Sequence, residues 1–329
     1  MKALIYTGPH EMAYQDAPDP IAASNEVLIK IDSVGICGSD MHAYLGHDER
    51  RPAPLILGHE AAGVTTDGAR VTVNPLVSCA QCHYCKTGRG NLCPSRQIIS
   101  MPPREGAFAE WLSMPVRNLV SVPDDISLEK AALAEPLACG WHAVRIGKAR
   151  LEQAAGGSVS AARTLVIGGG AIGVGAALSA AAQGFKNITL IEPNELRRDY
   201  IEQKLPFDIL HPDQIEPSAD FELVIDGVGY EATRALASAK AAPGGVIMHI
   251  GLGSATGGVD VRRLTLQEIT FIGTYTYNAD DFRQTAAAIF SGALGKLDWI
   301  EARPLQDGND AFHDIRSGEV AAPKIILKP

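Results

Sequence analysis

The feature that most constrains the fold of this chain is a glycine-rich turn between an apolar run and an alanine-rich segment. Gly168, Gly170 and Gly173 follow the apolar residues 164–167 in the pattern G-x-G-x-x-G. Such a sequence predicts a strand, a tight turn and a helix of small residues. A second apolar run leads to Glu192, and residues 164–192 span 29 positions, close to the ~30 residues of a βαβ unit. The pattern therefore predicts a parallel sheet.

The same turn predicts a dinucleotide site. Gly168 allows the tight turn, Gly170 lets the backbone approach a pyrophosphate, and Gly173 lets the helix pack close to the strand. The helix then begins at Ala171 and Ile172, where free N–H groups and the positive end of the helix dipole face the phosphates. A glycine-rich turn in an α/β domain without a nucleotide is the alternative interpretation.

The choice of nucleotide follows from the acidic residue after the second run. Glu192 can accept hydrogen bonds from both ribose hydroxyls of adenosine and would repel a 2′-phosphate, which favours NAD over NADP. Arg197 is a further candidate for a cofactor contact, although an arginine here could also accommodate a phosphate. Ile250, Gly251 and Leu252 follow a later apolar run, and we expect their backbone to contact the nicotinamide.

The pattern of strand-like and helical segments along the chain indicates two domains. The chain has 329 residues, about twice the ~150 residues of an average domain. The first 125 or so residues read as short strands between turns, such as the alternating run 26–34. Apolar runs and helical segments then alternate, which predicts a parallel sheet covered by helices on both faces. The strand-like residues 324–327 at the end could return to the first domain.

Composition excludes several classes of protein. Apolar residues make up 46% and charged residues 20%, as in ordinary globular proteins. The net charge of −9 argues against nucleic acid as a partner. No apolar run is long enough to span a bilayer, and the first residues are too polar for a signal peptide. We therefore expect a cytoplasmic protein without a membrane contact, in which the six cysteines stay reduced.

Four of these cysteines form a metal-binding pattern. Cys79, Cys82, Cys85 and Cys93 have the spacing C-x2-C-x2-C-x7-C. Four thiolates close the tetrahedral shell of a structural zinc ion and leave no position for water. An iron–sulfur cluster is one rival, but the bacterial motif needs its fourth cysteine where Arg89 stands. A zinc ribbon for nucleic acid is the other, and the acidic composition argues against it.

A second set of potential ligands is scattered along the chain. Cys37 ends the alternating run, His59 and Glu60 follow a short apolar run, and Glu135 precedes a proline. Taken singly they are unremarkable, because a lone cysteine is usually in the core and a lone glutamate is usually solvated. Beside the cysteine pattern and the glycine turn, they suggest a catalytic zinc, which needs a few N, S and O ligands and one exchangeable position.

Together these motifs resemble the zinc-dependent medium-chain alcohol and polyol dehydrogenases, most closely the sorbitol dehydrogenase-like branch. The resemblance covers nearly the whole chain and rests on GICGSDMH (35–42), GHE (58–60), the four cysteines, AEP (134–136) and GGGAIG (168–173). It implies an α/β plus β fold. A GroES-like zinc catalytic domain would occupy residues 1–137, with 278–329 returning to it, and a Rossmann NAD-binding domain with a doubly wound parallel sheet would occupy 138–277.

The resemblance also implies roles for single residues. The catalytic zinc would be held by Cys37 and His59, with Glu60 and Glu135 completing the shell directly or through water. Ser39 would hydrogen-bond the substrate hydroxyl, and His42 would end the proton relay in solvent. Tyr44 and Tyr275 are candidates for the substrate pocket. Zinc would polarise the substrate oxygen while the hydride passes to NAD.

The implied reaction is the reversible oxidation of a secondary alcohol or polyol by a homodimeric or homotetrameric enzyme with a catalytic and a structural zinc. The polyol branch often carries a substrate-binding arginine where this chain has Thr276, so the substrate need not be sorbitol. The alternatives are a threonine-type or other amino- or hydroxy-substrate dehydrogenase of the same family, a zinc-free quinone or enone reductase, and a non-catalytic binding protein.

Overall fold

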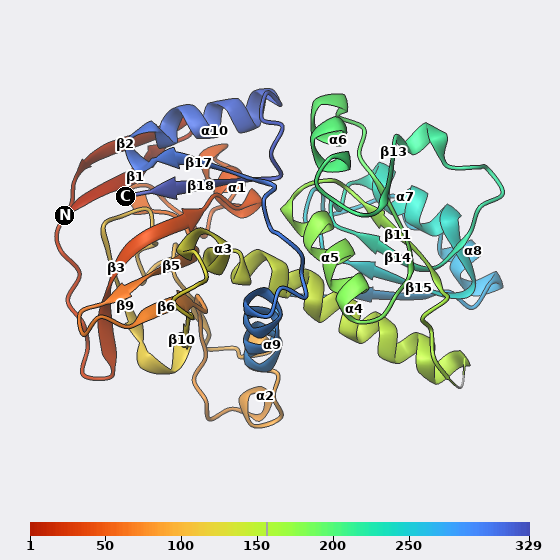
Figure 1. Cartoon of the computed structure of the whole chain (residues 1–329), viewed down its shortest axis with the longest axis horizontal. Coiled ribbons are helices and arrows are strands. Elements are labelled where there is room, and N and C mark those ends of the chain that lie inside the picture. The colour runs from red at the N-terminus through yellow and green to blue at the C-terminus, as the bar shows by residue number, and fades with distance from the viewer. Residues whose placement is uncertain (156) are drawn as a thin grey trace.

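The computed structural model describes residues 1–155 and 157–329, which form two units (Figure 1). One unit consists mainly of antiparallel strands, and the other is a parallel sheet covered by helices. The long helix α4 (Ala134–Ala155) runs from the first unit along the second. This architecture confirms the predicted α/β plus β class. The predicted domain boundary after residue 137 falls inside α4 and stays a prediction.

The glycine turn lies in a six-stranded parallel sheet with the order β13-β12-β11-β14-β15-β16. The strands are β11 (Arg163–Ile167), β12 (Asn187–Ile191), β13 (Asp208–Leu210), β14 (Phe221–Asp226), β15 (Ala241–His249) and β16 (Thr270–Gly273). Counted along the chain, this is the order of a doubly wound dinucleotide fold, which binds its ligand outside the carboxyl ends of the strands. The predicted parallel sheet is confirmed.

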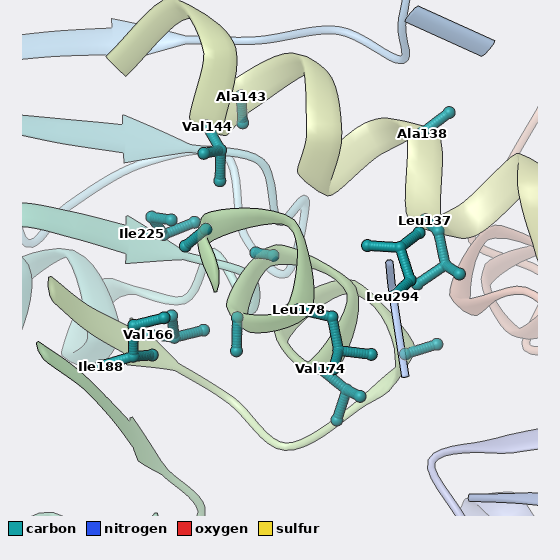
Figure 2. Close-up of a cluster of buried hydrophobic side chains, with 14 of the residues drawn as sticks. Leu137, Ala138, Ala143, Val144, Val166, Val174, Leu178, Ile188, Ile225 and Leu294 are labelled. Carbon is teal, nitrogen blue, oxygen red and sulfur yellow. The ribbon is translucent and has the colours of Figure 1, made fainter. Parts of the chain in front are cut away.

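Helices bury both faces of this sheet, which is why its strands are nearly continuous apolar runs. Val166 and Ile225 face a core shared with α4 and α5, whereas Leu165 and Val224 face α7 and α8. Figure 2 shows part of the first core, between α4, α5 and the strands. The helices in this unit are α5 (Ala171–Ala182), α6 (Glu195–Glu202), α7 (Glu231–Lys240) and α8 (Val261–Leu266).

Two glycines bring α4 close to α5. A Cβ atom on Gly140 would lie 2.6 Å from the backbone N of Ala176, and one on Gly175 would lie 2.8 Å from Cδ2 of Leu137. Both distances are shorter than van der Waals contact, so larger residues would push the helices apart. This close packing fixes the first turn of α4, which carries Glu135.

The first unit is built around a seven-stranded sheet with the order β10-β6-β5-β3-β18-β17, in which β9 also pairs with β3. Its strands are β3 (Glu26–Gly35), β5 (Glu60–Thr65), β6 (Arg70–Val73), β9 (Trp111–Pro115), β10 (Leu119–Ser121), β17 (Ile300–Pro304) and β18 (Lys324–Lys328). The smaller sheets contain β1 (Lys2–Gly8), β2 (Glu11–Asp16), β4 (Leu55–Ile56), β7 (Leu76–Val77) and β8 (Gln97–Ile98). The antiparallel register of β3 and β5 pairs Gly35 with Glu60.

The end of the chain packs against the first unit. Strand β18 pairs antiparallel with β3 and parallel with β17, so residue 324 comes close to residue 36. The remaining helices are α1 (Gly38–Tyr44), α2 (His83–Lys86), α3 (Leu128–Ala132), α9 (Ala279–Phe290) and α10 (Gly308–Ser317). The strand expected at 324–327 is confirmed.

Helix α4 extends past residue 149 to Ala155, and residue 156 lies outside the described residues. Alanine is the best helix former, which explains the extension. Within the described parts of the chain, every helix is too short or too polar to cross a membrane.

Candidate active site

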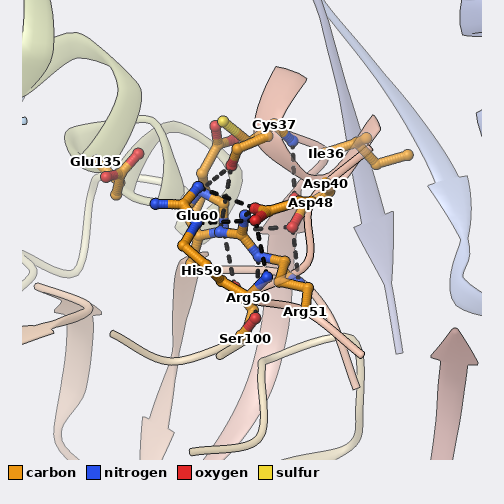
Figure 3. Close-up of polar contacts among 12 residues, drawn as sticks. Ile36, Cys37, Asp40, Asp48, Arg50, Arg51, His59, Glu60, Ser100 and Glu135 are labelled. Atoms are coloured by element: carbon orange, nitrogen blue, oxygen red, sulfur yellow. Dashed lines mark hydrogen bonds and ion pairs between the residues drawn. The ribbon is translucent and has the colours of Figure 1, made fainter. Parts of the chain in front are cut away.

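Cys37, His59 and Glu60 converge on one point (Figure 3). One ligand atom from each lies within 4.8 Å of the other two. Cys37 follows β3 as the N-cap of α1, and Glu60 is the first residue of β5, so the pairing of β3 with β5 brings the two segments together. Glycine is required at position 35, because a Cβ there would lie 2.0 Å from Oε2 of Glu60.

Asp40 holds two of these residues in place. Its Oδ2 accepts a hydrogen bond from the backbone N–H of Cys37 at 3.0 Å, and its Oδ1 lies 3.4 Å from Nδ1 of His59. Ser100 Oγ contacts the same His59 nitrogen at 3.2 Å. These partners occupy Nδ1 and leave Nε2 directed at Ser39, whose Oγ is 3.4 Å away. A carboxylate behind the ring is the usual support of a metal-binding histidine.

Lys324 is the residue at this site that the sequence interpretation missed. Its ammonium donates to Glu60 Oε1 at 2.6 Å and to the carbonyl of Ile36 at 2.7 Å, and its side chain is 3% exposed. The other carboxylate oxygen of Glu60, Oε2, is buried and has no hydrogen-bond partner among the described residues. Glu60 therefore offers one oxygen to a ligand while Lys324 holds the other.

Glu135 comes from α4 and lies outside the group of three ligand atoms. The phenol of Tyr277 donates to Glu135 Oε1 at 2.7 Å. Burial raises the pKa of Glu135 to about 7, and the nearby His59 only partly offsets this effect. The structure thus does not group Glu135 with the three ligands. Its completion of the zinc shell, directly or through water, stays a prediction.

The donor set fits zinc. A thiol, an imidazole and a carboxylate are the three ligand types that catalytic zinc sites combine. The electrostatic setting also favours a cation. Burial alone would lower the pKa of His59, but Asp40 and Cys37 raise it well above its usual value. A site that attracts a proton to an imidazole in this way attracts a metal ion for the same reason.

The four cysteines form the second metal group. Cys79, Cys82, Cys85 and Cys93 each place a sulfur atom within 4.8 Å of the others. The sulfur of Cys85 lies 3.9 Å from that of Cys79 and 3.5 Å from that of Cys82, which suits zinc–sulfur bonds of ~2.3 Å. Backbone N–H groups of Gln81 and Cys82 lower the pKa of Cys79 to about 6, which favours the metal-binding thiolate.

The glycine turn has the geometry that pyrophosphate binding requires. Gly168 has a φ of +103°, and a Cβ on Gly173 would lie 1.7 Å from the carbonyl oxygen of Gly168. Gly170 caps α5, and a Cβ there would meet no atom within 4 Å. The space beside Gly170 is open and faces the free N–H groups of Ala171 and Ile172, as the fold predicts for phosphate.

Glu192 lies beside the glycine turn, and Arg197 contacts the C-terminal segment. Glu192 follows β12 and is buried, and its oxygens accept hydrogen bonds from the backbone N–H groups of Gly169 and Asn194, both at 2.8 Å. Arg197 donates instead to the carbonyl of Val320 at 3.3 Å. This contact ties Arg197 to the C-terminal segment, and its contact with the cofactor stays a prediction.

Ile250, Gly251 and Leu252 follow β15 at the carboxyl edge of the parallel sheet. The N–H groups of Ile250 and Gly251 both donate to the carbonyl of Asp226. A Cβ on Gly251 would lie 2.1 Å from the backbone of Val228, so this loop packs tightly on the loop after β14. Dinucleotides bind at this edge in such folds, and the contacts of these three residues with the cofactor stay a prediction.

The two tyrosines proposed for the substrate pocket have different surroundings. Tyr44 is 3% exposed and packs against Phe312 at a ring distance of 5.1 Å, in the core of the first unit. Its position at the end of α1 makes it a core residue, which corrects the pocket interpretation. Tyr275 is half-buried after β16, and its carbonyl accepts a hydrogen bond from Asn91 of the cysteine segment at 2.9 Å.

Comparisons with known proteins agree with this geometry. Residues 23–124 match the alcohol dehydrogenase GroES-like domain, and residues 171–291 match the zinc-binding dehydrogenase family. The chain is 32% identical to the L-galactonate-5-dehydrogenase of Escherichia coli (strain K12) over 313 residues, which are 89% of this chain and 88% of the relative. It is 27% identical to the probable D-xylulose reductase A of Aspergillus clavatus, over 96% of this chain and 94% of that protein.

Solved structures show the same fold. A thermostable alcohol dehydrogenase from Pyrobaculum aerophilum superimposes with a TM-score of 0.88 at 25% identity, over 100% of this chain and 99% of that one. The fold, the two groups of metal-ligating side chains and the matches over both units lead to one conclusion. The chain belongs to the family of zinc-dependent medium-chain alcohol and polyol dehydrogenases.

Proposed function

We propose that this chain catalyses the reversible, NAD-linked oxidation of a secondary alcohol on a polyol-like substrate to the ketone. The observation that carries this proposal is the convergence of Cys37, His59 and Glu60 within 4.8 Å, with Ser39 beside His59. The relatives named L-galactonate-5-dehydrogenase and probable D-xylulose reductase A support a polyhydroxylated substrate.

Different residues of the chain have different roles in the proposed reaction. When bound, zinc held by Cys37, His59 and Glu60 would supply Lewis-acid polarisation, and NAD would supply the hydride acceptor. Ser39 Oγ is positioned to accept the proton of the substrate hydroxyl. His42 lies one turn further along α1 on the same face, where it can pass that proton to solvent. Glu135 and Tyr277 form a buried hydrogen-bonded pair.

The choice of NAD rests on Glu192. Its buried carboxylate lies at the end of β12 beside the glycine turn, where the charge of a 2′-phosphate would be repelled. We expect Glu192→Ala to weaken NAD binding by roughly 10-fold or more, as for lost charge-assisted hydrogen bonds, and NADP binding much less. An unchanged ratio of the two affinities, measured by fluorescence titration, would show that the ribose assignment is wrong.

We infer a homodimer or a tetramer built from dimers. Strand β16 is the outer strand of its sheet, and Leu252, Val261 and Leu266 near it are each more than 65% exposed. An unpaired edge strand beside exposed apolar side chains is suited to pairing with a second copy. Analytical ultracentrifugation of Leu266→Glu tests this: a shift to monomer supports the proposed interface, and an unchanged oligomer contradicts it.

A reducing compartment such as the cytoplasm is also part of the proposal. All six cysteines are free in the structure, and four of them gather in one metal group. Thiolates can hold zinc only when they are not oxidised to disulfides. Oxidative treatment should therefore release zinc from the purified protein, which a colorimetric chelator can follow.

The function is tested with the zinc-loaded protein and a panel of alcohols. NADH formation is measured with pentitols, hexitols, sugar acids, simple secondary alcohols and threonine. Oxidation of a polyol or sugar acid supports the proposal, and strict preference for threonine would shift it to the amino-substrate branch. No NADH formation with any alcohol, in protein shown to contain zinc, would contradict it.

A further inference from the structure

Two adjacent arginines stand beside the reacting groups, and the reaction described above does not use them. Arg50 and Arg51 lie on the loop between α1 and β4. Nη2 of Arg51 is 3.5 Å from Ser39 Oγ, and its Nε donates to the carbonyl of Ser100 at 3.0 Å. Figure 3 shows both side chains in the group that contains His59 and Cys37.

Both arginines share one carboxylate. Arg50 donates to Asp48 through Nε at 2.8 Å and Nη2 at 2.9 Å, and Arg51 donates through Nη1 at 2.5 Å. Burial would raise the pKa of Asp48, but its bonds to Arg50 and the charge of Arg51 lower it to about 2. Asp48 is therefore ionised at any working pH and offsets one of the two positive charges.

Arg51 is buried and interacts with other buried groups. Its side chain is 2% exposed, and its charge is one of those that hold the pKa of the buried Asp40 low against the effect of burial. Arg50 differs, because its side chain is 63% exposed. Among the described residues, Nη1 of Arg50 has no hydrogen-bond partner. Arg50 therefore presents one unpaired guanidinium nitrogen at the surface.

A further guanidinium lies over the ring of Tyr275. The charged end of Arg96 lies 4.9 Å from the centre of that ring, and Nη1 of Arg96 donates to the carbonyl of Cys93 at 3.0 Å. Hydrogen bonding to Asp48 raises the pKa of Arg50.

We propose that the substrate is an anionic polyol, a sugar acid or a polyol phosphate, whose carboxylate or phosphate binds Arg50 while its secondary hydroxyl reaches Ser39. The inference rests on the proposed function and narrows its substrate class. A guanidinium binds either anion through paired N–H donors. A neutral polyol would make no use of this charged donor.

The test compares matched substrates and matched variants of the zinc-loaded enzyme. The substrates are a hexitol, the aldonate of the same carbon skeleton, and the hexitol 1-phosphate. The variants are Arg50→Gln and, as a control, Arg163→Gln, because Arg163 is also a half-exposed arginine paired with carboxylates but lies at the opposite, amino-terminal end of β11. Calorimetric titration with the aldonate measures binding without turnover.

We expect the wild type to favour one of the anionic substrates over the hexitol in kcat/KM, and the two anions identify whether the group is a carboxylate or a phosphate. In Arg50→Gln the ratio of kcat/KM for that anion to kcat/KM for the hexitol should fall about 10- to 100-fold, mainly through KM. Added salt should lower the wild-type preference and leave that of the variant nearly unchanged. Arg163→Gln should keep the wild-type ratio.

Equal or better use of the hexitol by the wild type, or an unchanged ratio and unchanged calorimetric affinity in Arg50→Gln, would overturn the inference and leave the proposed function intact. Absence of oxidation for all three substrates, together with no calorimetric binding of the aldonate, would contradict the inference. Oxidation of the other alcohols of the panel would then show that the proposed function survives.

Discussion

The two metal groups of this protein are built in opposite ways. The four cysteines come from one segment, residues 79–93, and are all of one type. Cys37, His59 and Glu60 come from the ends of separate strands, are of three types, and depend on Asp40, Ser100 and Lys324 to hold them. The first group is local and closed, as a structural site must be, and the second is assembled by the fold around an open position. Damage to the first should therefore cost stability, and damage to the second should cost activity.

The largest effect should come from Cys37→Ser. Loss of the thiolate removes the zinc that polarises the substrate, which is worth several kcal/mol in the transition state, or ~10³-fold in kcat. The melting temperature should stay close to the wild-type value, because Cys37 is a side chain at the end of β3 and not part of a core. Cys139→Ser is the matched control and should keep its activity. A Cys37 variant that loses stability and keeps its rate would contradict the catalytic role of this metal group.

Cys93→Ser should have the opposite profile. Cys93 is the buried member of the four cysteines, and its loss opens the tetrahedral shell. We expect a loss of ~2 kcal/mol or more in stability and a fall in melting temperature of roughly 4 °C or more. The rate per correctly folded molecule should change little. Calorimetry measures the stability, and active-site titration gives the rate per correctly folded molecule. An equal loss of stability and of rate in this variant would show that the two metal groups are not independent.

The same comparison explains what the sequence could predict. The spacing of Cys79, Cys82 and Cys85 and the glycine turn at 168–173 are local patterns, and the structure builds both as expected. Lys324 lies 264 positions from Glu60, in a strand whose pattern indicates only burial, so no local signal could pair them. A buried lysine in a final strand was the available hint, because such a charge needs a partner.

One residue was misread for a related reason. Tyr44 was a candidate for the substrate pocket, but α1 turns its side chain into the core against Phe312. The contact of Arg197 with Val320, from the returning C-terminal segment, had no local signal either, and the cofactor contact of Arg197 stays a prediction. Contacts made by that segment depend on the antiparallel pairing of β18 with β3, which single-sequence patterns do not reveal.

Lys324→Met should have an intermediate effect on the catalytic group. Removal of the ammonium frees Glu60 Oε1 and leaves a buried carboxylate without its partner. Because such supporting residues orient metal ligands, we expect a loss of roughly 10- to 100-fold in zinc affinity or activity. The rate of zinc transfer to a chelator reports the loss of zinc affinity. Lys328→Met, in the same strand and paired with Asp32, is the control. Equal zinc release from both variants would contradict a positioning role for Lys324.

The smallest effect should come from a polar contact that involves neither metal group. Asp281 of α9 accepts hydrogen bonds from His142 and Arg145 of α4, both at 2.6 Å. Burial would raise the pKa of Asp281, but these two partners lower it. A lowered carboxylate pKa adds stability above the unfolded-state pKa of ~3.9, and this stability is lost as pH falls through the folded-state pKa.

Asp281→Asn should therefore lose about 2 kcal/mol or less at neutral pH, below the usual value for a buried pair because Arg145 is 41% exposed. The difference from the wild type should shrink below about pH 4. Urea unfolding at several pH values provides the measurement. If the difference in the free energy of unfolding between the wild type and Asp281→Asn grows as the pH falls, the lowered pKa of Asp281 is contradicted. Zinc content should be unaffected, which makes this variant a baseline for the cysteine variants.

Zinc content per chain, measured together with NADH formation, tests the central claim most directly. The two groups of ligands predict that the wild type holds two zinc ions and that Cys37→Ser and Cys93→Ser each hold one. Only Cys37→Ser should lose hydride transfer. A wild type with a single zinc ion, or a Cys37→Ser variant that keeps both its metal and its rate, would contradict the account.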